Sequence, residues 1–264
     1  MSSIWEDFEI NCTELLNRKF GDYASFKHEG GSDSTVPDIK VTTKSGRVFY
    51  IEAKHSPAQC GQFVLLPDIG SRTFIYSHQN TTRINTYAKR IMEHMNTQFD
   101  DFKEAGTAGK DIIMNNGSEI FSNWIIETYE NKGTRYFITN NFTILPIERF
   151  SEYFNVSAKY RVKRSGSSSV GKSNVSNVLR YIKSHGYVIE SIRENGGKLF
   201  VESYQQLHNQ RFLLCGHEYM LSLRDSEYEI RKLSNTFNAN VIFSINFKNI
   251  INGVKADEFI RALK

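Results

Sequence analysis

The residue types best suited to chemistry lie in one short segment that contains Asp38, Glu52 and Lys54. Two carboxylates in an apolar setting repel each other unless one is protonated or a cation bridges them. Mg²⁺ takes oxygen ligands, usually one or two carboxylates together with waters and substrate phosphate oxygens. A lysine beside such a cation can orient or deprotonate an attacking water and stabilise a pentacovalent transition state. The set therefore suits metal-dependent hydrolysis of a phosphodiester, and it lacks the thiolate or imidazole ligands that are typical of zinc sites.

A β-hairpin is the element that must position these three side chains. Apolar residues alternate with polar ones on both sides of a Thr-Lys-Ser-Gly turn at residues 43–46, namely Val36, Ile39 and Val41 before it and Phe49 and Ile51 after it. With the turn centred near Ser45, Asp38 lies opposite Glu52, and directly paired Cβ atoms are about 4.5–5.5 Å apart. Lys54 falls on the same face as Glu52, because side chains alternate along a strand.

The remaining pattern predicts helices and strands in mixed order. A helix, a hairpin, then helices and further strands favour an α/β (α+β) fold with a mixed central β-sheet flanked by helices. We expect a core over residues 1–164 and a DNA-recognition region over 165–264, either separate or continuous with the core, with a Ser/Gly-rich linker at 164–173. The expected elements are helices over 4–20, 80–105, 121–129 and 174–185, a hairpin turning at 195–197, and strands over 135–139, 211–214 and 241–247.

The charge distribution points to a polyanionic partner. The excess of 33 Lys and Arg over 29 Asp and Glu is small, but the stretch from Tyr153 to Ile189 holds seven basic residues and no acid. A solvated basic face is the alternative interpretation. Ser and Gly groups in this stretch could also hydrogen-bond phosphates. The candidates for DNA contact are Arg161, Lys163, Arg164, Ser165, Ser167 and Lys172.

A competing motif lies in the same stretch. Residues 166–173 (Gly-Ser-Ser-Ser-Val-Gly-Lys-Ser) satisfy the phosphate-binding loop pattern of nucleotide hydrolases. Such a loop follows a buried, nearly continuous apolar strand, whereas residues 159–164 are heavily charged. The context therefore argues against nucleotide hydrolysis.

The hairpin residues resemble a known family. Pro37-Asp38 followed by Glu52-Ala53-Lys54 resembles the signature of the PD-(D/E)XK nuclease superfamily, and residues 30–34 are similar to the Gly/Ser-rich loop of archaeal Holliday junction resolvases. The helix, loop and hairpin context covers roughly the first quarter of the chain. The resemblance implies a restriction-endonuclease-like core in which Asp38 and Glu52 bind Mg²⁺ and Lys54 serves the nucleophile.

The resemblance also implies one further glutamate on the first helix. Glu9 is the best match and Glu14 the second, with an ordinary solvated carboxylate as the alternative for either. Gln59 and Gln62 follow the lysine closely, with ordinary loop residues as the alternative for both. Gln62 is a further candidate catalytic residue that could order a water or touch the DNA backbone.

These observations predict a Mg²⁺-dependent type II restriction endonuclease that cuts double-stranded DNA at a short specific sequence. The resemblance implies a homodimer, with a cognate DNA methyltransferase as a genetic rather than physical partner. The alternatives are a structure-selective or repair nuclease, such as a Holliday junction resolvase, and a non-catalytic DNA-binding protein. Cys12, Cys60 and Cys215 are odd in number and far apart, and no long apolar run is present, so we expect a cytoplasmic protein with no membrane partner.

Overall fold

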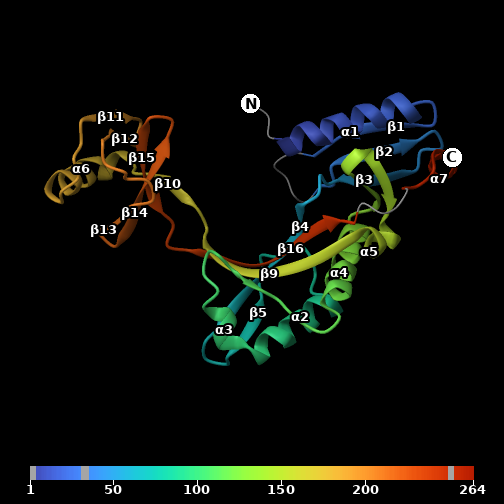
Figure 1. Cartoon of the computed structure of the whole chain (residues 1–264), viewed down its shortest axis with the longest axis horizontal. Coiled ribbons are helices and arrows are strands. Elements are labelled where there is room, and N and C mark those ends of the chain that lie inside the picture. Colours follow the sequence, from blue (N-terminus) through green and yellow to red (C-terminus); the bar gives the residue numbers. More distant parts are fainter. Residues whose placement is uncertain (1–3, 31–35, 249–252) are drawn as a thin grey trace. The chain divides into compact units, whose positions relative to one another are not determined.

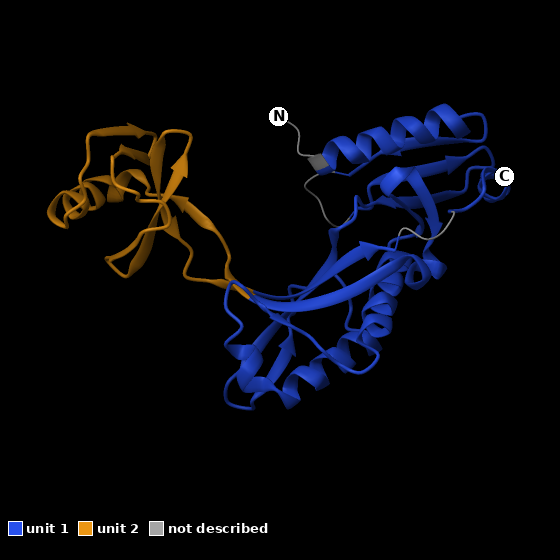
Figure 2. Ribbon diagram, in the orientation of Figure 1, with its two compact units in different colours: residues 1–161, 239–264 blue, residues 162–238 orange. Residues whose placement is uncertain are grey.

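The chain divides into two compact units, each with its own sheet and core. The structure, a computed structural model, describes residues 4–30, 36–248 and 253–264 (Figure 1). Unit 1 comprises residues 1–161 and 239–264, and unit 2 comprises residues 162–238 (Figure 2). Residues 239–264, which the sequence assigned to the C-terminal region, thus belong to unit 1. None of the helices formed by the described residues is long and apolar enough to cross a membrane.

The first sheet of unit 1 is mixed. Its strands β3 and β7 pair in parallel, and its other neighbouring strands pair antiparallel. The strand order is β1 (Ala24–His28), β2 (Ile39–Thr43), β3 (Val48–Ala53), β7 (Thr134–Thr139) and β8 (Thr143–Pro146).

The β2–β3 hairpin has the register that the sequence predicted. Ile39 pairs with Ile51 and Val41 with Phe49. Asp38 lies one residue before β2 begins, so it stands at the open end of the ladder, where Glu52 is the facing position on β3. The structure therefore confirms that these two residues face each other across the hairpin.

Helices cover both faces of this sheet. On one face, α1 (Ile4–Phe20) and α7 (Ala256–Leu263) share an apolar core with β3, in which Leu16, Ile51 and Phe259 are buried. On the other face, α4 (Gly117–Asn131) packs on β7, where the rings of Tyr129 and Phe137 lie 5.2 Å apart. The expected mixed sheet flanked by helices is confirmed. Glu52 alternates with Ile51 along β3 and therefore points away from the α1 core.

A second sheet completes unit 1, and its core is aromatic. Phe63, Trp124 and Phe243 pack against one another with ring centroids 4.4–5.8 Å apart. The strand order is β5 (Thr73–Tyr76), β4 (Ala58–Asp68), β16 (Phe237–Phe247), β9 (Phe154–Arg164) and β6 (Lys110–Asp111).

The helix predicted over residues 80–105 is shorter and broken. Its observed parts are α2 (Thr86–Thr97) and α3 (Phe99–Lys103). The helix begins late because the Asn85 side chain caps the Ala88 N–H at 2.8 Å, and because Asn80 is bonded to β4 instead of joining the helix. Short helical segments also lie at η1 (Asn140–Phe142), η2 (Ile147–Arg149) and α5 (Phe150–Tyr153).

Unit 2 is a sheet covered by one amphipathic helix. Its core includes Val178 and Ile182 from the helix and Leu199, Leu221 and Ile230 from the sheet. The order is β11 (Ser191–Asn195), β12 (Lys198–Glu202), β15 (Glu227–Leu233), β14 (His217–Arg224) and β13 (Arg211–Leu214), with β10 (Ser167–Ser169) on β15, η3 (Lys172–Asn174) and α6 (Val175–Ser184).

The segment expected to be a linker, residues 164–173, is instead built into unit 2. Ser167 pairs with Leu233 and Ser169 with Arg231 in an antiparallel ladder. This ladder satisfies the backbone groups that a solvated linker would leave to water. The strand before Lys172 is short and antiparallel, whereas a phosphate-binding loop follows a parallel strand. Residues 166–173 therefore do not form such a loop.

Candidate active site

Asp38, Glu52 and Lys54 form one ionic cluster at the end of the β2–β3 hairpin. Lys54 Nζ lies 2.6 Å from Glu52 Oε1 and 3.3 Å from Asp38 Oδ2. The backbone N–H of Ala53 donates to Asp38 Oδ2 at 2.8 Å. Lys54 is itself held against β7, because its N–H donates to the Ile138 carbonyl at 2.9 Å. The hairpin register therefore brings together the three side chains that the sequence selected.

Burial makes this cluster electrostatically unusual. Asp38 and Glu52 are 7% and 5% exposed. Burial and the neighbouring Glu52 carboxylate raise the pKa of Asp38 to about 7, although the Lys54 ammonium opposes this shift. Burial acts to lower the pKa of Lys54, but the attraction of Glu52 and Asp38 outweighs it, so the pKa of Lys54 lies well above its ordinary value. The ammonium group is thus held in its charged form by the two carboxylates.

The cluster suits a hard cation. Glu52 Oε2 is buried and has no hydrogen-bond partner, which is an expensive state for a carboxylate oxygen unless a cation or water meets it. Within residues 4–30, 36–248 and 253–264, no group of three or more His, Cys, Asp or Glu side chains is arranged to hold a metal ion. The Asp38 and Glu52 carboxylates are the kind of oxygen donors that bind a divalent cation whose other ligands are waters and phosphate oxygens.

Glu9 of α1 reaches the same cavity. It is 5% exposed, and its Oε2 lies 3.0 Å from His28 Nε2. Burial raises the pKa of Glu9, partly offset by the hydrogen bond with His28 and the charge of Lys54. Gly30 allows the close approach, because a Cβ at that position would lie 2.5 Å from Glu9 Oε2. Glu14, the second candidate, is exposed to solvent.

The Gly/Ser-rich lead-in that supported the family resemblance is described only at Gly30, whose N–H donates to the Asp38 carbonyl at 3.0 Å. The rest of that loop, at positions 31–34, lies outside the described residues. Its predicted role stays a prediction.

A β-bulge in β4 turns two glutamines into the cavity. Opposite Phe243 of β16, β4 carries two residues, Cys60 and Gly61, and the register shifts there. Gly61 has φ +94°, a conformation that glycine adopts without steric penalty. Residues three apart normally point to opposite faces of a strand, but the extra residue lets Gln59 and Gln62 both line the cavity. Gln59 Nε2 donates to Gln62 Oε1 at 3.2 Å.

The cavity that contains this cluster has a volume of about 470 Å³. The sequence did not single out the other polar groups that line it. They come from the segment after β5, from α4 and from the residue that follows α4, and no motif marks them in the sequence: Gln79, Asn80, Thr81, Thr82, Thr128, Tyr129 and Lys132. Burial and the nearby Glu52 carboxylate raise the pKa of Tyr129 well above its ordinary value.

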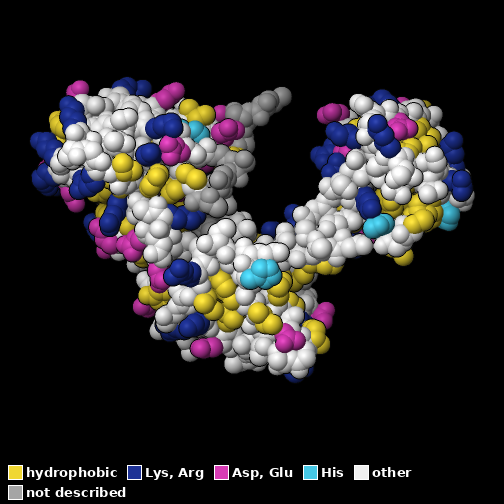
Figure 3. All heavy atoms as spheres, turned by 180° about the vertical axis from the view of Figure 1, so that it is seen from behind, with side chains coloured by type: hydrophobic (Ala, Val, Ile, Leu, Met, Phe, Trp, Pro, Cys, Tyr) yellow, Lys and Arg dark blue, Asp and Glu magenta, His cyan; other side chains and the backbone are white. Residues whose placement is uncertain are grey.

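The residues predicted to contact DNA are placed differently from one another. Arg161 belongs to unit 1, and its Nε is buried without a hydrogen-bond partner. Lys163 and Lys172 are exposed in unit 2. Arg164 is engaged within unit 2, since it forms an ion pair with Glu218 and donates to the Ser234 carbonyl at 2.7 Å. Lys and Arg side chains are spread over the visible face of both units (Figure 3).

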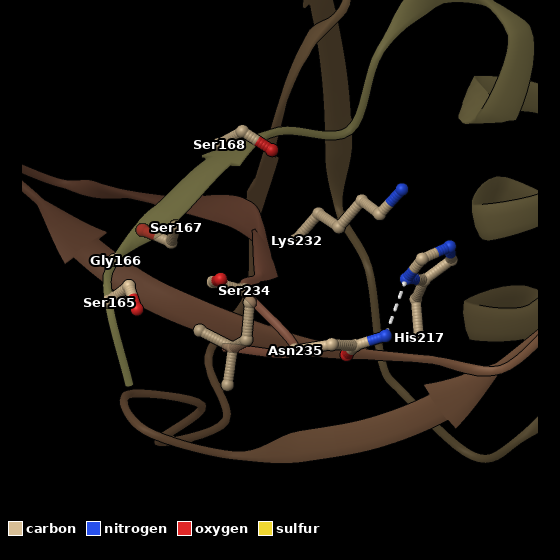
Figure 4. A pocket seen from close by; sticks show the side chains of 9 residues that line it. Ser165, Gly166, Ser167, Ser168, His217, Lys232, Ser234 and Asn235 are labelled. Carbon is tan, nitrogen blue, oxygen red and sulfur yellow. Dashed lines mark hydrogen bonds between the residues drawn. The ribbon is translucent and has the colours of Figure 1, made fainter. Parts of the chain in front are cut away.

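Ser165 and Ser167 line an open pocket of about 400 Å³ in unit 2, together with His217, Lys232 and Asn235 (Figure 4). The Ser167 hydroxyl accepts from Arg231 Nε at 3.2 Å, and that of Ser165 accepts from Thr236 at 2.7 Å. Lys232 and the neighbouring hydroxyls offer the kind of donors that bind phosphate oxygens. The predicted DNA contacts of this set stay predictions.

A comparison with solved structures assigns the family. The structure matches that of the HhaI endonuclease in complex with DNA with a TM-score of 0.74 and 38% sequence identity, over 98% of this chain and 97% of that one. The chain belongs to the HhaI endonuclease family. Its fold is that of a restriction endonuclease, which confirms the predicted fold class. No protein-family model matches the sequence, and no curated protein matches it.

Proposed function

We propose that this protein is a Mg²⁺-dependent type II restriction endonuclease that hydrolyses phosphodiester bonds of double-stranded DNA at a short specific sequence. Membership of the HhaI endonuclease family supports DNA cleavage, because that relative is an endonuclease bound to DNA. The observation that carries the proposal is the buried cluster in which one ammonium lies between two carboxylates at the wall of an open cavity. The resemblance to the PD-(D/E)XK superfamily assigns the roles within this cluster.

Asp38 and Glu52 would hold the metal ion. The Ala53 N–H fixes one oxygen of Asp38, and the buried Oε2 of Glu52 is available as a ligand. A bound Mg²⁺ lowers the pKa of a water and neutralises charge on a phosphoryl group. Gln62 and Glu9 line the same cavity, where the Gln62 amide can donate to a water or a phosphate oxygen and the Glu9 carboxylate can accept from a water.

Lys54 acts on the nucleophile and on the charge that develops during attack. Its backbone is fixed on both sides, because its N–H donates to Ile138 and its carbonyl accepts from the Thr139 hydroxyl at 2.7 Å. The fixed backbone keeps Nζ at the wall of the cavity, where it can hydrogen-bond an attacking water. From the same position Nζ can stabilise the charge of the pentacovalent transition state with little reorganisation.

The proposal includes further partners. We propose that the protein acts as a homodimer in which each subunit cuts one DNA strand. We also propose that a DNA methyltransferase gene lies beside the gene for this protein. Unit 2 is the proposed source of additional DNA contacts, through Lys163, Lys172 and the serine-lined pocket.

The test is digestion of plasmid DNA by the purified protein with and without Mg²⁺, followed by sequencing of the ends. Discrete, reproducible ends that require a divalent metal support the proposal. Ends scattered over the plasmid, or cleavage confined to four-way junctions, favour a nonspecific or structure-selective nuclease. Altered gel mobility without any cleavage would identify a DNA-binding protein and overturn the proposal.

Lys54→Gln tests the assigned chemistry. We expect the cleavage rate to fall by about 10²-fold or more, the scale of losing one preorganised electrostatic group. Lys44→Gln is the matched control, because Lys44 is an exposed lysine at the turn of the same hairpin, and its cleavage rate should stay at the wild-type level. Full activity in Lys54→Gln would refute the role of this lysine.

A further inference from the structure

A second cavity of unit 1 adjoins the catalytic one. It has a volume of about 710 Å³ and is bounded by residues 81–89 and by the C-terminal half of α4. Thr81, Thr82, Thr128 and Lys132 line both cavities, so the two adjoin along these residues, and Lys54 lines the first cavity alone. We call the second cavity the flanking groove.

The segment that walls the flanking groove is held in place by side-chain hydrogen bonds. Asn80 accepts from the Val64 N–H at 2.7 Å and donates to the Val64 carbonyl at 3.0 Å, as a paired strand residue would. The Tyr76 hydroxyl lies 2.9 Å from the Thr82 hydroxyl and 3.1 Å from its carbonyl. Asn85 caps α2 at 2.8 Å from the Ala88 N–H. The segment is therefore fixed before any ligand arrives, which reduces the entropy lost on binding.

The flanking groove carries more positive than negative charge. Arg83 and Lys89 line it, are exposed, and form no ion pair with any residue in the described part of the chain. Glu127 is the one carboxylate among the residues that line it. The first turn of α2 also opens onto this groove and contains no acidic residue. Guanidinium, ammonium, hydroxyl and backbone N–H groups together form the donor set that contacts nucleic-acid backbones.

We propose that the flanking groove binds the sugar-phosphate backbone of the cleaved DNA strand, with Arg83 and Lys89 contacting phosphates next to the one that is cut. This inference rests on the proposed function, because it takes the ligand at Lys54 to be the scissile phosphate. A strand that leaves the catalytic cavity past the shared residues Thr81 and Thr82 would then run towards α2. Arg83 and Lys89 position the strand and do not touch the reacting atoms.

The experiment compares wild-type protein with the double variant Arg83→Gln/Lys89→Gln. Arg90→Gln is the matched control, because Arg90 is an exposed α2 cation that does not line the groove. Binding to a short DNA duplex is measured without divalent metal at several salt concentrations between about 50 and 200 mM. Cleavage kinetics are then measured with Mg²⁺ on a fragment that contains the site mapped from the plasmid ends.

Each phosphate contact contributes about 0.9 to the slope of log K against log salt, so the double variant should lose about 1.8 from that slope. We expect KM to rise about tenfold with kcat changed less than about threefold, since uniform binding is lost but the catalytic cluster is intact. Arg90→Gln should retain the wild-type slope and KM.

The outcomes separate this inference from the proposed function. Wild-type cleavage together with an unchanged salt slope and KM in Arg83→Gln/Lys89→Gln would overturn the groove assignment alone. A loss of salt slope in Arg90→Gln that is half the loss in the double variant, and so equal for each charge removed, would also overturn it, because the effect would then come from net charge. Wild-type protein that neither binds nor cuts DNA would overturn the proposed function and this inference with it.

Discussion

Replacing Asp38 by Asn should stabilise unit 1 while abolishing cleavage. The folded protein raises the pKa of Asp38 from 3.8 to about 7. Above pH 7 the Asp38 carboxylate is ionised in both the folded and the unfolded chain. In the folded chain this charge is buried and lies next to Glu52, which lowers the free energy of unfolding by an amount that the pKa shift measures. The difference of about three pKa units corresponds to roughly 4 kcal/mol at 1.36 kcal/mol per unit. Asn is neutral and can still accept the Ala53 N–H through its side-chain oxygen.

The pH dependence gives the sign of the effect. Between pH 3.8 and about 7 the unfolded chain has lost the Asp38 proton but the folded chain keeps it, so the free energy of unfolding falls as pH rises through this window. The advantage of Asp38→Asn over wild type should therefore be about 1.6 kcal/mol near pH 5 and about 4 kcal/mol near pH 8. The attraction between Lys54 and the Asp38 carboxylate is already contained in the pKa of about 7, so these values need no separate correction for it.

Urea denaturation in metal-free buffer measures these free energies. Trp5 and Trp124 are the two tryptophans of the chain and both belong to unit 1, so tryptophan fluorescence follows that unit selectively. Added Mg²⁺ should stabilise wild type and leave Asp38→Asn unchanged, since ligand binding to the folded state raises stability. Asp22→Asn, at an exposed turn position, is the control, and its stability should change by less than about 0.5 kcal/mol. A stability difference for Asp38→Asn that is negative, or equal at both pH values, would refute the reasoning.

Two further predictions concern the walls of the catalytic cavity. Glu9→Gln should lower the cleavage rate about 10- to 100-fold and raise the Mg²⁺ concentration needed for half-maximal rate. Glu14→Gln, on the exposed side of the same helix, is the control and should match wild type. Equal rates in both variants would show that Glu9 is not part of the site. Gly61→Ala should destabilise unit 1 by about 2–4 kcal/mol in the urea assay, because its Cβ would lie 2.8 Å from the Trp124 ring. Gly46→Ala is the control, since Gly46 also has a positive φ but open space around it, and its stability should fall by only about 1 kcal/mol. Equal losses of stability in the two variants would show that the ring contact is unimportant.

The hairpin could be predicted because its determinants are local. Alternation around a Thr-Lys-Ser-Gly turn fixes which residues face each other, and a shift of one residue would have exposed Ile39 and Ile51. Asp38, Glu52 and Lys54 then follow from the register alone. Glu9 was predicted only through the family resemblance, since a helical pattern does not reveal which carboxylate will meet a distant strand.

The features that escaped prediction depend on contacts between distant segments. The bulge at Gly61 arises from pairing with β16, far along the chain, so nothing in the local pattern announces that Gln59 and Gln62 share a face. The late start of α2 depends on Asn80 bonding to β4 rather than continuing a helical pattern that residues 80–85 could formally join. The serine-rich stretch was taken for a linker because its ladder partner, β15, lies more than fifty residues away.

The passage of the chain between the two units has a consequence for how such enzymes diversify. Unit 2 is entered through β9 and left through β16, and these strands are neighbours in one sheet (Figure 1). The Ser165 N–H donates to the Thr236 carbonyl where the two strands leave unit 1, so the ends of the insertion lie side by side. A short turn could therefore replace the whole of unit 2 without removing a single strand pairing from the catalytic unit. If unit 2 supplies DNA contacts as proposed, insertion, loss or exchange of its gene segment at this point would alter those contacts and leave the site in unit 1 unchanged.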